Sequence, residues 1–206
     1  MKNHPYAKYI WDYFMGRIGN EYGVAALMGN LRAESGLYPD RLQGDIPYSS
    51  TSQNYTALVD SGAVSEYDFV HNGPNGGGYG LAQWTFYTRK QNLYDMYKEG
   101  NYKSIGSIEL ACDFLWVELN MSFSGVLNAL KSATSIRAAS DKVLHDFEAP
   151  ADQSTAMEET RETLSREVYN TFAGSAPIDP DAPEKPIYRK KLSKLLLMAI
   201  AIDSQY

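Results

Sequence analysis

Helical spacing of apolar residues constrains this chain more than any other feature of its sequence. In VAALMGNLRAESGLYPD, residues 24–40, apolar side chains recur at positions that share one helical face: Val24, Leu27, Met28 and Leu31. Glu34 follows three residues after Leu31 and lies on the same face. Gly36 suits the left-handed backbone that ends a helix. The stretch predicts a buried helix over about 22–34 that carries a carboxylate at its end.

The same periodicity predicts a mainly α fold. Further helices are expected at residues 6–18, 87–98, 107–120, 124–132, 136–147 and 155–172. In the last of these the inward stripe is expected to be Met157, Thr160, Leu164, Val168 and Phe172. The segment from about 43 to 78 is rich in Ser, Thr, Asn, Asp and Gly, so we expect a small β and loop region between the second helix and the glycine-rich turn.

Length and composition indicate one folded body with an appendage. The chain has 206 residues, of which 44% are hydrophobic, enough for a real core. We expect a domain over 1–174, a proline-rich linker over 175–186 and a helical tail over 187–206. The tail's apolar run is far shorter than the ~20 residues that a membrane-spanning helix needs. Stable membrane insertion is therefore not expected.

Charge and cysteine content exclude several classes of function. The formal net charge is -6, without a strongly basic stretch before residue 185, so nucleic acid is not an expected partner. The one cysteine, Cys112, sits in an apolar run and is predicted to be a buried thiol. His71 and His145 lack ligand partners at useful spacing, so neither a metal nor another cofactor is expected. The start of the chain does not resemble a secretory signal.

Glu34 on an apolar face can reflect an error of register, a salt-bridged core residue, or an acid kept from water so that it holds its proton, and we predict the last of these. An ordinary glutamate, with a pKa of about 4.3, is almost wholly ionised at neutral pH. Burial against apolar neighbours such as Leu27 and Leu31 disfavours the charged form of a carboxyl group. In the rival explanation Glu34 pairs with Arg32, Arg41 or another cation and merely closes the helix.

Two motifs resemble a known family. AESGLYPD, residues 33–40, followed by GYGLAQW, residues 78–84, resembles the signature pair of the lysozyme-like superfamily, with Ala82 where methionine is usual. The Gly-Leu-Ala-Gln-Trp form, with HDFEAPADQ at 145–153 ahead of a last helix, resembles the phage tail lysozyme family more closely. The resemblance covers about residues 5–173.

The resemblance implies a lysozyme-like fold and cleavage of bacterial peptidoglycan. It makes Glu34 the general acid, since cleaving a glycosidic bond requires a proton on the leaving oxygen. Ser35 is expected to support the glutamate through local hydrogen bonds. The other expected substrate-binding residues are Tyr79, Gly80, Leu81, Gln83 and Trp84, with Trp84 alternatively part of the core.

The second carboxylate is the less determined part of the site. Acidic residues in the polar segment are candidates, with Asp45 the first choice and Asp40, Asp60 and Asp68 behind it. If none is in reach, the substrate's own 6-hydroxyl can attack, as in a lytic transglycosylase. Glu118 and Glu148 also follow apolar residues, and we interpret Glu148 as a structural acid near Arg161.

The preferred interpretation is a hydrolase of the β-1,4 bond between N-acetylmuramic acid and N-acetylglucosamine. The alternatives are a lytic transglycosylase on the same scaffold and a glycan-binding or structural tail module without catalysis. Glycan strands are the expected partner, with phage tail or other lysin components beside them. The expected place of action is the cell wall, reached from the phage virion or by release from the host cytoplasm.

Overall fold

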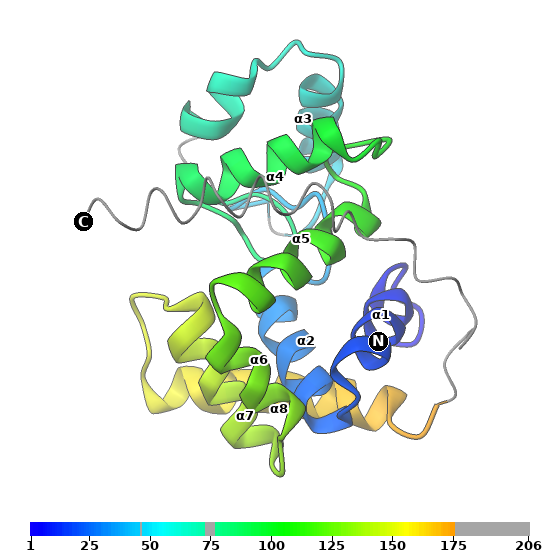
Figure 1. Ribbon diagram of the computed structural model, residues 1–206, viewed down its shortest axis with the longest axis vertical. Coiled ribbons are helices and arrows are strands. Elements are labelled where there is room, and N and C mark those ends of the chain that lie inside the picture. The colour runs from blue at the N-terminus through cyan, green and yellow to red at the C-terminus, as the bar shows by residue number, and fades with distance from the viewer. Residues whose placement is uncertain (46, 73–76, 176–206) are drawn as a thin grey trace. The chain divides into compact units, whose positions relative to one another are not determined.

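Helices make up most of the computed structural model, which describes residues 1–45, 47–72 and 77–175 (Figure 1). The predicted mainly α fold is confirmed, and each of the seven predicted helices is present. Their bounds are α1 Ala7–Ile18, α2 Glu21–Ser35, α4 Tyr87–Glu99, α5 Ile108–Met121, α6 Ser124–Lys131, α7 Ile136–Val143 and α8 Thr155–Phe172. A π-helical turn, η3 (Leu144–Glu148), continues α7 to the end of the predicted 136–147 helix.

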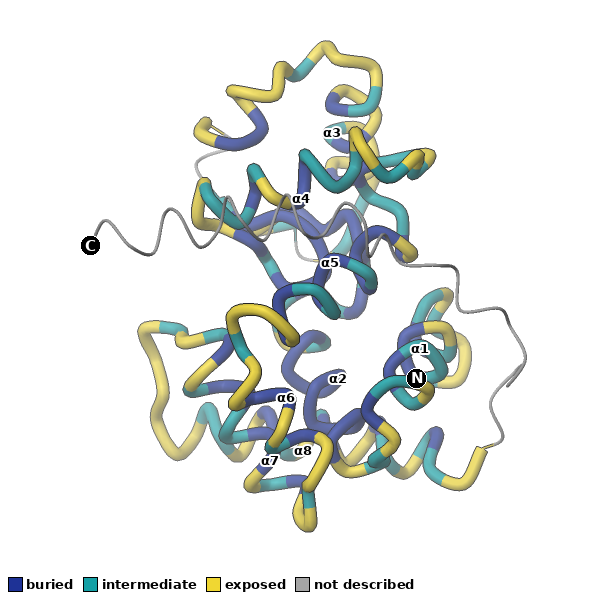
Figure 2. The backbone as a smooth tube through the Cα atoms, viewed as in Figure 1, coloured by how far each residue is buried: buried dark blue, intermediate teal, exposed yellow. Residues whose placement is uncertain are grey.

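Helix α2 is enclosed by other helices. Ten of its fifteen residues are buried, and it contacts α1, α6, α7 and α8 (Figure 2). Two glycines permit the close approach of its neighbours. A Cβ atom on Gly23 would lie 2.1 Å from the Leu130 carbonyl oxygen, and one on Gly29 would lie 2.0 Å from the Ser165 hydroxyl oxygen. Because α2 is covered on several sides, its apolar residues extend beyond one stripe.

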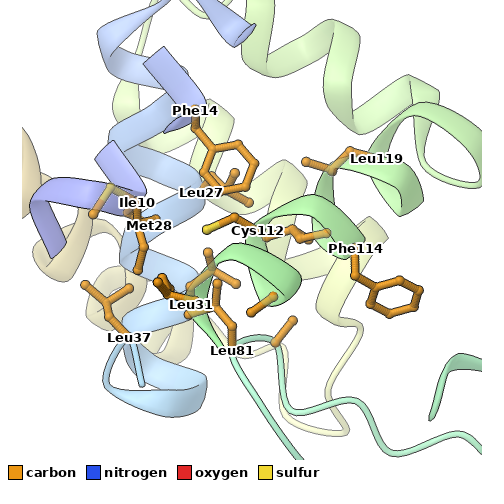
Figure 3. Packing of buried hydrophobic residues seen from close by; sticks show 14 of the residues in the cluster. Ile10, Phe14, Leu27, Met28, Leu31, Leu37, Leu81, Cys112, Phe114 and Leu119 are labelled. Atoms are coloured by element: carbon orange, nitrogen blue, oxygen red, sulfur yellow. The ribbon is translucent and has the colours of Figure 1, made fainter. Parts of the chain in front are cut away.

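The apolar core joins helices to the glycine-rich turn. Figure 3 shows side chains of α1, α2 and α5 packed together with Leu37 and Leu81. Cys112 of α5 is a free, fully buried thiol within this cluster, as the sequence predicted. Leu81 is likewise fully buried. The core therefore fixes the 78–84 turn against the helices.

The polar segment between α2 and the turn differs from the prediction. Instead of loop and short strand it contains helix α3 (Ser50–Asp60) and the π-helical turn η1 (Asp68–Asn72). The buried face of α3 consists of Ser52, Thr56 and Val59, so a search for apolar periodicity misses it. Pairing of β type is limited, among the described residues, to isolated bridges of Tyr79 with Leu42 and with Trp84.

The inward face of α8 also differs from the prediction. Its buried residues are Arg161, Ser165, Val168 and Phe172, whereas Thr160 is exposed and Leu164 is half-buried. The close contact at Gly29 favours the small side chain of Ser165 there. Arg161 lies one turn before Ser165 on the same face, so the rotation of α8 carries a guanidinium into the interior.

The described body belongs to one compact unit, Met1–Ala176. Except for residue 175, the predicted linker over 175–186 and the predicted tail over 187–206 lie outside the described residues. In the described ranges no single helix is long and apolar enough to cross a membrane. Helices α5 and α6 reach that length and composition only together, and they are bent by 101°.

The contact between Gly29 and Ser165 gives a test of the α2–α8 packing. We expect Gly29→Ala to lower the free energy of unfolding by about 2 kcal/mol, because a methyl group there overlaps the backbone of α8. Gly16→Ala in α1 is the control, since a Cβ there meets no atom within 4 Å and alanine favours helix by up to about 1 kcal/mol. Urea unfolding of both variants measures the difference. Equal stabilities would contradict the packing.

Candidate functional site

Glu34 stands in the last turn of α2, where the helix leaves the core. The hydroxyl of the next residue, Ser35, donates to the Leu31 carbonyl at 3.0 Å and accepts from the Leu37 amide at 3.1 Å, as the sequence predicted. Gly36 ends the helix with φ 66°, and Leu37 follows with φ 69°. A left-handed leucine is unusual and costs free energy, which indicates a tightly determined turn beside Glu34.

An arginine from the last helix holds the Glu34 carboxylate. Arg161 donates from Nη2 to Glu34 Oε1 at 2.5 Å and from Nη1 to the Asn30 carbonyl at 2.8 Å. The Arg161 side chain is 6% exposed, whereas that of Glu34 is 21% exposed. Apolar neighbours alone therefore do not surround Glu34. The structure shows the rival explanation, pairing with a cation, and that cation is Arg161. Arg32 binds Glu167 instead.

Glu148 places a second carboxyl group near Glu34. It ends η3 and is followed by Ala149 with φ 43°, another strained position. The residue is half-buried, but its Oε1 atom is shielded from solvent and has no hydrogen-bond partner among the described residues. Burial, reinforced by the negative charge of Glu34, raises the pKa of Glu148 to about 8, although Arg89 and Arg161 oppose the rise. The expected pairing with Arg161 is absent as a direct hydrogen bond.

A third acid, Glu118 of α5, is fully engaged with its neighbours. Arg89 of α4 donates to its two carboxylate oxygens at 2.6 and 2.9 Å. The indole Nε1 of Trp84 donates to Oε2 of the same carboxylate at 2.8 Å. The guanidinium of Arg89 also lies 5.0 Å from the ring centroid of Phe147, the residue before Glu148. These contacts connect the 78–84 turn to the end of η3.

The 78–84 turn is bonded to the chain that follows α2. The Gly80 amide and the Gln83 side-chain amide both donate to the Arg41 carbonyl, at 2.8 and 3.0 Å. Gly80 has φ 83°, and a Cβ there would lie 2.7 Å from the Trp84 ring. The glycine is therefore needed for packing within the protein. The two motifs that the sequence singled out are brought together by residues 39–43.

Several expected substrate-binding side chains lie in the core. Tyr79 is 2% exposed, and Leu81 and Trp84 are fully buried. The Tyr79 hydroxyl lies 2.8 Å from the Thr56 hydroxyl. The rings of Tyr79 and Trp84 are covered and cannot contact a sugar in this structure, and Trp84 takes the core position that the sequence left as its alternative. Gln83 remains half-buried at the edge of the turn, with φ 47°.

Asp45 has a structural task in this structure. Its carboxylate accepts hydrogen bonds from the amides and hydroxyls of Ser49 and Ser52, at the start of α3. The two hydroxyl groups are the main cause that lowers the pKa of Asp45 to about 2. The other predicted acids also accept hydrogen bonds from within the chain: Asp40 from Tyr48, Asp60 from the Ile105 amide and Asp68 from Ser65. A catalytic role for Asp45 stays a prediction.

The exposed aromatic rings are not those of the 78–84 motif. Phe86 and Tyr87, just after the turn, are 72% and 56% exposed, and Tyr67 is 65% exposed. The imidazole of His71 lies 4.6 Å from the Tyr67 ring and 5.6 Å from the Tyr87 ring. We call Tyr67, His71, Phe86 and Tyr87 the aromatic patch. The high aromatic content was the signal for such a surface, but composition does not say which rings are exposed.

The charged cluster can support acid–base chemistry. It combines an accessible carboxylate held by arginine with a half-buried carboxyl group of raised pKa, and such divergent environments are typical of acid–base pairs. Within the described ranges no group of three or more His, Cys, Asp and Glu residues is placed to hold a metal ion.

Comparison with known proteins agrees with the two sequence motifs. A family model described as phage tail lysozyme matches residues 5–172, which include Glu34, the 78–84 turn, Glu148 and Arg161. No curated protein and no solved structure matches the chain. The family match spans every helix of the described body, and the chain belongs to the phage tail lysozyme family.

Proposed function

We propose that this protein hydrolyses the β-1,4 bond between N-acetylmuramic acid and N-acetylglucosamine in peptidoglycan, with Glu34 as general acid. Membership of the phage tail lysozyme family supports a lysozyme-like action on peptidoglycan. The particular bond and the role of Glu34 are inferences from the chemistry of the site.

The observation that carries the assignment is the accessibility of Glu34. Of the three glutamates in the charged cluster, Glu118 is 9% exposed and has three donors on its carboxylate, and Glu148 has a shielded Oε1 atom. Glu34 is 21% exposed and is oriented by a buried arginine. The side chain of Glu34 is therefore both accessible to solvent and held in one orientation. A group that contacts the glycan needs both properties.

The proposed step is a proton transfer to the glycosidic oxygen. Protonated Glu34 gives its proton to the leaving oxygen as the bond to the anomeric carbon breaks. Water then adds its hydroxyl group to that carbon, and its remaining proton restores the acid. Arg161 contributes by orienting the side chain of Glu34.

A lytic transglycosylase is the second candidate, favoured by the state of Asp45. Four intrachain hydrogen bonds and a pKa of about 2 make Asp45 a poor base for activating water. Without a protein base, the 6-hydroxyl of the muramic acid can attack the anomeric carbon and form the anhydro product. Proton donation by Glu34 is common to both reactions.

The proposed setting is the bacterial cell wall during phage infection or release. The family description supports a phage context. Within it we propose that the protein acts either from the virion, beside other tail components, or after release from the host cytoplasm. Glycan strands are the proposed partner in both cases.

Replacement of Glu34 by glutamine tests the proposed acid. We expect Glu34→Gln to slow clearing of a cell-wall suspension roughly 100-fold or more, because the amide cannot donate a proton. The control is Glu159→Gln, which makes the same chemical change on an exposed position of α8 and should leave clearing unchanged. Equal clearing by wild type and Glu34→Gln would remove Glu34 as the acid, and no clearing by either protein would favour a binding module without catalysis.

Mass spectrometry of the released muropeptides separates the two reactions. We expect reducing ends that carry the mass of one added water, because hydrolysis transfers a hydroxyl group to the anomeric carbon. Anhydro ends that lack this water would replace the hydrolase by the transglycosylase. A digest with a known muramidase supplies the reference masses.

The aromatic patch is proposed to bind sugar rings beside the cleavage point. A contact with an aromatic ring contributes about 1 kcal/mol, so Tyr87→Ala should weaken binding to purified cell walls roughly fivefold. Binding is measured in a Glu34→Gln background to prevent degradation. Tyr22→Ala is the matched control, since Tyr22 is 38% exposed at the opposite end of α2. Equal losses in both variants would contradict a specific role for the patch.

A further inference from the structure

The second carboxyl group of the charged cluster has a role that the motifs did not indicate. Glu148 closes a π-helical turn, a feature that is common at functional sites, and its shielded Oε1 atom has no hydrogen-bond partner within the described ranges. Most buried polar atoms in proteins do have such a partner. The buried Nε atom of Arg161 likewise has none in the part of the chain that the structure describes.

Charged groups from four elements act on the Glu148 carboxyl. They are Glu34 of α2, Arg89 of α4, Glu118 of α5 and Arg161 of α8. With Glu148 they make five charged groups. Four of these form direct ion pairs, because Arg89 binds Glu118 and Arg161 binds Glu34. Three carboxyl groups face two guanidinium groups, so full ionisation would leave one negative charge without a bonded partner.

That surplus charge falls on Glu148. An unpaired buried carboxylate is costly, and such a group keeps its proton instead. The cluster is therefore nearest to neutrality when it holds one proton. The site contains this proton at a pH at which an exposed glutamate has lost its own.

We propose that Glu148 is a positioning residue that acts through Glu34, its shielded carboxyl group sharing a proton with Glu34 beside the Arg161–Glu34 pair. The inference rests on the proposed role of Glu34 as general acid. Interacting carboxyl groups lose their protons in two steps that belong to the pair. Glu148 can pass its proton to Glu34, so the site keeps one proton while the ionised member changes. The side chain of Glu34 is accessible and delivers the proton to the glycan.

The pH dependence of activity tests the pair. The wild-type rate should fall as pH rises through about 8, where the pair loses its last proton. In Glu148→Gln the second carboxyl group is gone, so the fall should begin at least one pH unit lower, with a tenfold or greater loss at pH 8. Activity at pH 5 should stay within about threefold of wild type. Glu148→Asp keeps a carboxyl group and should restore the wild-type profile, while Glu159→Gln should not change it.

Carbon NMR of the carboxyl groups gives a readout that does not require activity. Glu148 should titrate near pH 8 in the wild type, and its midpoint should fall by one unit or more in Glu34→Gln, because the charge of Glu34 is removed. This measurement stands even if Glu148→Gln fails to fold.

Different outcomes test the carboxyl pair and the proposed function separately. An unchanged Glu148 midpoint in Glu34→Gln overturns the coupling, and so does an unshifted activity profile in folded Glu148→Gln. A shifted midpoint in a protein that does not degrade peptidoglycan keeps the carboxyl pair and overturns its use in catalysis.

Discussion

The enclosure of α2 by four other helices fixes the position of the candidate site. Contacts with α1, α6, α7 and α8 require that α2 present small residues where its neighbours approach most closely, and Gly23 and Gly29 fill that need. A helix held in this way has little freedom to rotate or shift. Its last turn therefore presents Glu34 in one direction, where the chain leaves the core.

Burial of α2 also determines which charges meet at its end. Because α8 packs against Gly29 through Ser165, Arg161 points into the interior and reaches both the Asn30 carbonyl and Glu34. The end of η3 brings Glu148 to the same cluster, where Arg89 and Glu118 complete it. Strained backbone lies next to each part of the site: Leu37 after α2, Gln83 in the turn and Ala149 after Glu148. Strained backbone of this kind is kept where many surrounding contacts hold it in place.

The site divides its tasks between buried and accessible groups. Glu118, Trp84 and Arg89 form a bonded unit that fixes the 78–84 turn against α4 and α5. Glu34 remains accessible, and the aromatic patch offers exposed rings just beyond the turn. The Gly-Leu-Ala-Gln-Trp motif therefore acts largely through the interior: its glycine permits the close contact with Trp84, and its glutamine ties the turn to Arg41.

Apolar residues at helical spacing were enough to predict seven helices and the buried thiol of Cys112, and two short motifs were enough to indicate the family. Helix α3 was not predicted, because its buried face is built largely from serine and threonine. Arg161 was not predicted on the inward face of α8, because an arginine does not continue an apolar stripe. The pairing of Arg161 with Glu34, and the place of Glu148 beside them, came from the packing of the helices. The reason is physical: the charge state of a carboxyl group depends on the groups that surround it in space, and these come from helices far apart in the chain.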